Sequence, residues 1–100
     1  LIEFKANKQP IGSYENMNDF EQIEIPIFEG DSLYLFTDGF ADQFGGVRGK
    51  KFKYLPLKQL LLEIDHLSME EQKKAIMQSF NSWKGNFEQV DDVCIIGVKL

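Results

Sequence analysis

Two uninterrupted apolar runs constrain the fold of this chain more than any other feature. Residues 33–36 and 93–98 contain no charged side chain. A strand with one buried face alternates apolar and polar residues, whereas a strand buried on both faces does not. The second run includes the only cysteine, Cys94, so no disulfide can form within the chain and we expect a buried thiol. Both runs are therefore predicted to be buried strands.

Two further segments have strand-like patterns. Residues 1–5 are rich in apolar side chains, and isoleucine occupies every second position in the later part of residues 20–27. That spacing is the period of a half-buried strand, and Pro26 favours a position at a sheet edge. The turn at residues 29–31 would join this segment to residues 33–36, so we expect a hairpin.

Two helices are predicted between the last two strands. Pro56 suits the first turn of a helix, and leucine and isoleucine then recur at helical spacing as far as Asp65. Ser68 and Glu71 have the S-x-x-E spacing of a capping box for a second helix, and Gly85 is placed to end it. The sequence therefore predicts an α+β chain with about four strands and two main helices.

Charge and apolar content exclude several classes of partner. The formal net charge is −5 and the sequence pI is about 4.8, which disfavours binding to nucleic acid or to an anionic membrane surface. Residues 1–100 contain no run of about 18 apolar residues and open on no signal-peptide pattern, so we expect any membrane anchor of the parent protein to lie outside them. We expect no nucleic-acid partner, no membrane contact by this chain and, given the lone cysteine, a cytoplasmic location.

Aspartates flank the two apolar runs. Asp38 follows residues 33–36 closely, and Asp91 and Asp92 come directly before residues 93–98. If the two strands are antiparallel neighbours, Asp38 and Asp91 converge on one rim, where their repulsion favours a bound cation. Carboxylates favour Mg²⁺ or Mn²⁺, and no Cys/His cluster suits zinc. Spacing alone favours a simpler alternative, in which each aspartate only begins or ends a loop.

Three motifs resemble those of one enzyme family. Residues 30–39, with an acidic residue at Asp42, resemble the G-D-x-L-x-L-x-T-D-G-x-x-[DE] motif of PPM-type phosphatases in the stage II sporulation protein E branch. Residues 89–96 resemble that branch's closing D-D-x-T-[LIV]-[LIV] motif, and residues 10–12 its P-[LI]-G turn. Cys94 stands where threonine is usual, at a position that is not a metal ligand in the family. The resemblance covers essentially the whole chain.

The resemblance implies a metal-dependent hydrolase. The expected fold is a portion of a PPM-phosphatase β-sandwich, predominantly antiparallel and flanked by helices. Asp38 and Asp91 would bind two Mg²⁺ or Mn²⁺ ions, with Gly39, Asp42 and Asp92 in supporting positions. The ions would activate a water for attack on phosphoserine or phosphothreonine, so no catalytic side chain from the protein is expected.

The family's earlier aspartate-glycine-histidine motif does not occur in this sequence. We therefore expect residues 1–100 to be the C-terminal part of one phosphatase domain whose N-terminal half is absent. This piece alone should be inactive and bind metal weakly or not at all. Strand edges left uncovered would favour a homo-oligomer.

Two functions remain open. The first is a bacterial signalling phosphatase with a phosphorylated protein substrate and an upstream sensor or regulatory domain in the parent chain. The second is a non-catalytic interaction module with a degenerate phosphatase fold. A calcium-stabilised domain is weaker, because no twelve-residue acidic loop is present. Lys50 and Lys51, in a glycine-rich stretch expected to be a flexible loop near the site, either form a solvated turn or attract the phosphorylated substrate.

Overall fold

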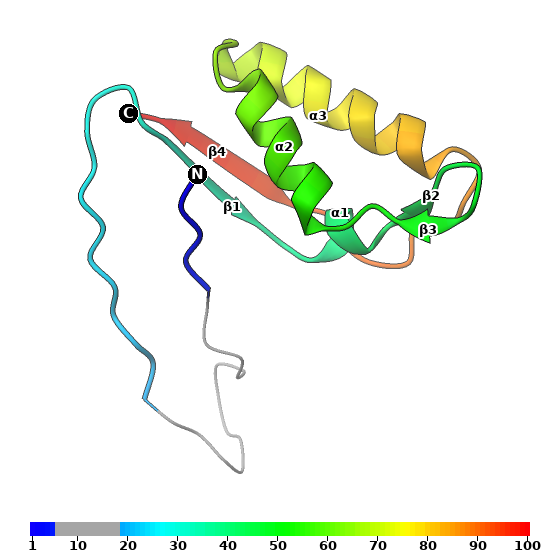
Figure 1. Ribbon diagram of the computed structural model, residues 1–100, viewed down its shortest axis with the longest axis horizontal. Helices are drawn as coiled ribbons and strands as arrows, with labels where there is room; N and C mark the ends of the chain where they lie inside the picture. The colour runs from blue at the N-terminus through cyan, green and yellow to red at the C-terminus, as the bar shows by residue number, and fades with distance from the viewer. Residues whose placement is uncertain (6–18) are drawn as a thin grey trace.

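The structure is a computed structural model that describes residues 1–5 and 19–100, so the turn expected at residues 10–12 lies outside it (Figure 1). In this part of the chain short antiparallel strands alternate with helices, which confirms the expected α+β class. The elements are β1 (Ser32–Phe36), α1 (Gly39–Asp42), β2 (Phe44–Gly45), β3 (Lys50–Lys51), α2 (Tyr54–Ile64), α3 (Met69–Lys84) and β4 (Ile95–Lys99). Across the described residues, none of the helices is long and apolar enough to cross a bilayer.

The first and last strands form the main sheet. β1 pairs with β4 in antiparallel register, with Leu35 opposite Ile96 and Phe36 opposite Ile95. Helices α2 and α3 lie over one face of these two strands (Figure 1). On that face Tyr34, Phe36 and Ile95 pack against the buried core. The condition set for Asp38 and Asp91 to converge, that the two apolar runs are antiparallel neighbours, is therefore met.

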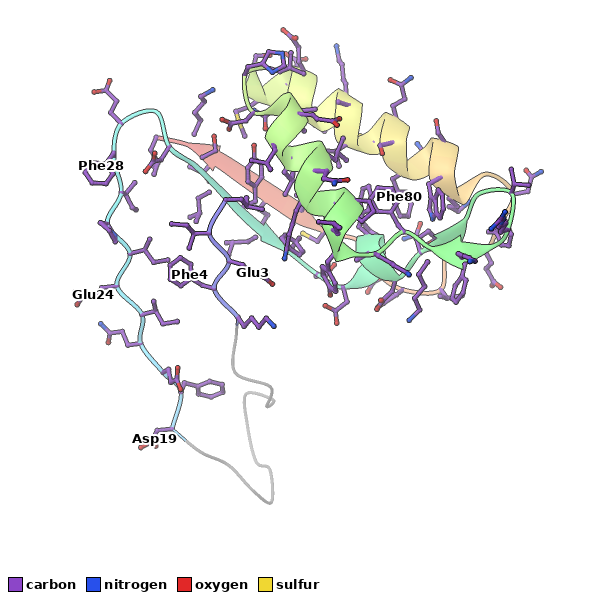
Figure 2. The ribbon with its side chains drawn as sticks, in the orientation of Figure 1. Glu3, Phe4, Asp19, Glu24, Phe28 and Phe80 are labelled. Carbon is purple, nitrogen blue, oxygen red and sulfur yellow. The ribbon has the colours of Figure 1, made fainter. Side chains whose placement is uncertain are left out.

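The core lies between the helices and the sheet. Its buried members are Phe40, Leu57, Leu61 and Ile64. The three α2 residues recur at spacings of three and four, which places them on one helical face. Phe80 of α3 points into this core (Figure 2), with its ring centroid 5.1 Å from that of Phe40.

The helix predictions are confirmed by their end groups. The Ser68 hydroxyl accepts a hydrogen bond from the backbone N–H of Glu71 at 3.2 Å, so Ser68 caps α3. At the other end Gly85 has φ 51° and donates its N–H to the carbonyl of Asn81, a conformation that favours glycine. Helix α2 begins at Tyr54, two residues before Pro56.

Within the described residues, the outer face of the main sheet is partly exposed, which corrects the prediction that both strands are buried on both faces. Leu33, Leu35, Ile96 and Val98 alternate with the core residues and are 40%, 60%, 52% and 43% exposed, respectively. The apolar runs lack polar alternation, but the described helices cover only one side. Cys94, predicted to be buried, is exposed for the same reason.

Residues 1–5 and 20–27 form no strand, which corrects two further predictions. They are irregular, and Figure 1 shows residues 19–28 as an extended segment leading away from the helices. The expected hairpin with β1 is absent. The turn instead continues the β1–β4 pairing: Gly30 N–H donates to the Leu100 carbonyl at 2.7 Å, and Leu100 N–H donates to the Asp31 carbonyl at 2.9 Å. Residues 1–5 contact α2 through a Glu3–Lys58 ion pair at 2.5 Å, and Lys58 lowers the pKa of Glu3.

Candidate functional site

The end of β1 and the segment that leads into β4 are joined by Thr37. Its backbone N–H donates to the carbonyl of Cys94 at 3.0 Å. Its hydroxyl donates to the carbonyl of Asp92 at 3.1 Å and accepts from the N–H of Cys94 at 3.1 Å. Asp38 follows Thr37 in the chain, so the structure brings the Asp38 and Asp91–Asp92 segments to the same end of the sheet, where β1 ends and β4 begins.

Gly39 allows the two segments to approach closely. It is buried, and a Cβ atom added there would overlap the carbonyl group of Asp92 and lie 3.0 Å from Val93 Cγ2. Any side chain at this position would push the two segments apart. The glycine in the predicted motif is therefore explained by sterics at this edge.

The Asp38 carboxylate is held by a residue that the sequence analysis did not identify. Tyr54, the first residue of α2, donates its hydroxyl to Asp38 Oδ1 at 2.5 Å. This hydrogen bond, together with partial burial and the nearby negative charges, raises the pKa of Tyr54 to about 12. Asp38 makes no side-chain cap for α1, so its carboxylate is turned toward Tyr54 instead.

Asp91 and Asp92 are exposed in the segment that precedes β4. Asp91 Oδ1 accepts a hydrogen bond from the N–H of Asp92 at 2.8 Å, and the Gln89 side chain donates to the Asp91 carbonyl at 3.0 Å. These residues and Val90 line a polar hollow of about 240 Å³. The local bonds fix the bend that precedes β4 and leave carboxylate oxygens open to solvent.

The glycine-rich stretch after α1 is a short hairpin, which corrects the prediction of a flexible loop. Strands β2 and β3 pair antiparallel, and Gly46 N–H donates to the Trp83 carbonyl at 2.9 Å. Lys51 lies 3.6 Å from Asp42 in a half-exposed ion pair. Lys50 is exposed beside it. Asp42 therefore contacts a lysine of the hairpin.

Gln43 is a second residue that sequence reasoning missed. It is 2% exposed, and its side-chain amide donates to the carbonyls of Phe44 and Glu88 at 2.9 and 3.0 Å. Its own carbonyl accepts from the Trp83 indole at 2.9 Å. Gln43 thus connects the hairpin and α3 to the segment that reaches Asp91. No local signal marks it, because a buried glutamine and an exposed one look alike in a sequence.

The side chains at this end of the sheet are of the type that binds a divalent cation, but they are too few to complete a coordination shell. Asp38, Asp91 and Asp92 supply the hard oxygen atoms that Mg²⁺ and Mn²⁺ prefer. Within residues 1–5 and 19–100, however, no three Asp, Glu, His or Cys side chains are grouped closely enough to hold a metal ion. A cation at this end of the sheet would need ligands beyond these described side chains.

Comparison with known proteins matches this chain to a family model and to a solved structure. The family model described as Stage II sporulation protein E (SpoIIE) matches residues 2–100. Among solved structures, the chain is similar to the SiaA-PP2C domain of Pseudomonas aeruginosa, with a TM-score of 0.77 and 30% sequence identity over 83% of this chain. That match covers 34% of the other chain, so this chain spans about a third of its length. No curated protein matches this chain.

Proposed function

Because this chain belongs to the stage II sporulation protein E family of PPM-type phosphatases, we propose that it supplies one edge of a metal-dependent phosphatase site. The intact domain would hydrolyse phosphoserine or phosphothreonine on a partner protein. Asp38 and Asp91 would bind Mg²⁺ or Mn²⁺, with Asp92 beside them. The cations would supply Lewis-acid activation of a water, so no protein nucleophile is needed.

The observation that carries this proposal is the bridge made by Thr37. Its hydroxyl bonds to the backbone of both Asp92 and Cys94, which holds the acidic segment before β4 next to Asp38. Mutual repulsion would otherwise separate carboxylates placed on one edge. The bridge holds the two acidic segments together, and among residues 1–5 and 19–100 no lysine or arginine forms an ion pair with Asp38, an arrangement that suits a cation-binding role.

The positive charge of the β2–β3 hairpin favours the proposal of a phosphorylated substrate. Arg48, Lys50 and Lys51 lie within four positions of a chain whose net charge is −5. Lys51 is partly neutralised by Asp42, so Lys50 is the better candidate to attract a phosphorylated segment. In the parent chain we propose control by an upstream sensor or regulatory domain. The free Cys94 thiol agrees with a reducing, cytoplasmic location.

The test replaces the carboxylates in the full-length protein. Asp38→Asn and Asp91→Asn preserve volume and remove a charged ligand, so hydrolysis of a phosphorylated peptide with Mn²⁺ should fall by orders of magnitude. Asp31→Asn is the matched control, because Asp31 lies at the opposite end of β1 and accepts a backbone hydrogen bond from Phe28. Undiminished turnover by Asp38→Asn would reject the site assignment.

One observation favours the alternative of a non-catalytic interaction module. No three metal-ligating side chains are grouped together among the described residues. A degenerate phosphatase fold that has lost its metals would also lack such a group. Calorimetric titration of Mn²⁺ into the full-length protein separates the two functions. Binding of two ions supports the enzyme, whereas the absence of binding together with retained partner binding supports the module.

A further inference from the structure

We propose that Tyr54 is a positioning residue for Asp38: its hydroxyl holds one carboxylate oxygen and thereby presents the other to a divalent cation. This inference rests on the proposed function, because it assigns a role to Tyr54 only if Asp38 binds metal. It adds a residue that lies outside all three sequence motifs.

The hydrogen bond itself is short and specific. The Tyr54 hydroxyl lies 2.5 Å from Asp38 Oδ1, at the short end of the range for a neutral donor and a charged acceptor. A carboxylate has two oxygens, and a bond to one of them fixes the rotation of the group. The second oxygen, Oδ2, then has a defined direction, which an octahedral cation such as Mg²⁺ requires of its ligands.

Tyr54 is itself held from two sides. Its ring centroid lies 6.1 Å from that of Phe36, the last residue of β1. It begins α2, which is anchored in the core by Leu57 and Leu61. The Tyr54 side chain therefore connects helix α2 to Asp38, just after the end of β1.

A strained backbone places the phenol beside Asp38. Lys53 has φ 77° and ψ 163°, and it is the one non-glycine residue with positive φ among residues 1–5 and 19–100. Its N–H donates to the Ala41 carbonyl at 2.7 Å, which fixes this conformation. Such strain persists where surrounding contacts determine it, and it is concentrated at functional sites. Here it turns the chain from β3 into α2 with Tyr54 facing Asp38.

Tyr34 offers a matched structural counterpart. Its hydroxyl makes a bond of similar length, 2.6 Å, to the Gln72 side chain. That bond is part-buried beneath the helices, and Gln72 is 1% exposed. The Tyr54–Asp38 bond is exposed, so we expect it to contribute less to stability. Its position on a proposed ligand gives it a different role, because outer partners of metal ligands change affinity by about 10–100-fold.

The experiment compares Tyr54→Phe with Tyr34→Phe in the full-length protein. We expect Tyr54→Phe to weaken Mn²⁺ binding by about 10–100-fold in calorimetric titration, and to lower the unfolding midpoint in metal-free buffer less than Tyr34→Phe does. Tyr34→Phe should lower that midpoint and leave Mn²⁺ affinity unchanged. In wild-type protein labelled with ¹³C-tyrosine, adding Mg²⁺ should shift the Cζ signal of Tyr54 and leave that of Tyr34 in place.

The outcomes separate this inference from the proposed function. Wild-type Mn²⁺ affinity in Tyr54→Phe, or a Tyr54 signal that does not respond to Mg²⁺ in a protein that binds it, overturns the positioning role alone. If the wild-type protein binds no divalent cation, the proposed function fails and the positioning role fails with it. The labelled wild-type measurement does not depend on the folding of any variant.

Discussion

The Thr37 hydroxyl donates a hydrogen bond to the carbonyl oxygen of Asp92, 55 residues later in the chain, at 3.1 Å. The hydroxyl oxygen of Thr37 in turn accepts a hydrogen bond from the backbone N–H of Cys94. One side chain therefore satisfies two backbone groups of the segment that carries the candidate carboxylates. Because β1 and β4 are also paired along their length, this bridge extends the pairing to the acidic end of the sheet.

Removing the Thr37 hydroxyl should loosen this edge. Thr37→Val keeps the branched shape but leaves the Cys94 N–H without its partner, so the free energy of unfolding should fall by about 1 kcal/mol. Thr37→Ser keeps the hydroxyl and is the control. Denaturant unfolding measures both variants, and equal losses for valine and serine would show that the hydroxyl bridge contributes nothing.

Adding one carbon at Gly39 should separate the two acidic segments. In Gly39→Ala the new Cβ overlaps the Asp92 carbonyl, so we expect a loss of about 1–3 kcal/mol in stability and weaker Mn²⁺ binding by the full-length protein. Gly85→Ala is the comparison, because Gly85 has φ 51° and open space around it. That variant should lose stability through backbone strain alone and bind Mn²⁺ normally.

The outer face of the main sheet should make the 100-residue chain associate. Leu33, Leu35, Ile96 and Val98 form an exposed apolar surface there, and the chain can cover it by pairing with another copy. Light scattering should show a mass that rises with concentration, and Leu35→Lys should reduce the rise. Val47→Lys, at a fully exposed position between β2 and β3 and outside the main sheet, should not. A strictly monomeric wild-type chain over a wide concentration range would contradict this expectation.

The sequence predicted the helices well because their determinants are local. Ser68 caps α3 through a residue three positions away, and Gly85 ends it through Asn81. The strand-like pattern of residues 20–27 was equally clear but misleading. A strand requires a partner for its backbone, and alternation within one segment cannot show whether that partner exists.

The candidate site was predicted only in outline, for a similar reason. The motifs placed Asp38 and the Asp91–Asp92 pair at the ends of two strands, and the structure joins those ends. Tyr54 and Gln43 act on partners 16 and 45 residues away, respectively. Their residue types are common, and their importance arises from the fold that surrounds them. The metal-binding role of the aspartates stays a prediction.

Tyr34 should make stability depend on pH in the alkaline range. Burial raises its pKa above the ordinary value of 10.0, with a further contribution from the negative charge of Asp65. In the unfolded chain the pKa of tyrosine is about 10, so the folded state holds the phenolic proton more tightly. The stabilising contribution is therefore complete below about pH 10 and is lost as the pH rises through the folded pKa.

The measurement is the free energy of unfolding of wild type and Tyr34→Phe at several values between about pH 8 and pH 11. Other tyrosines and the lysines titrate in both proteins, so the difference between the two curves isolates Tyr34. Phenylalanine also leaves Gln72 without its donor, which should lower stability at pH 8 by about 1 kcal/mol. We expect the two curves to converge as the pH rises, because only wild type has a phenol to ionise at this partly buried position. Parallel curves across the range would show that the burial of Tyr34 does not favour its neutral form.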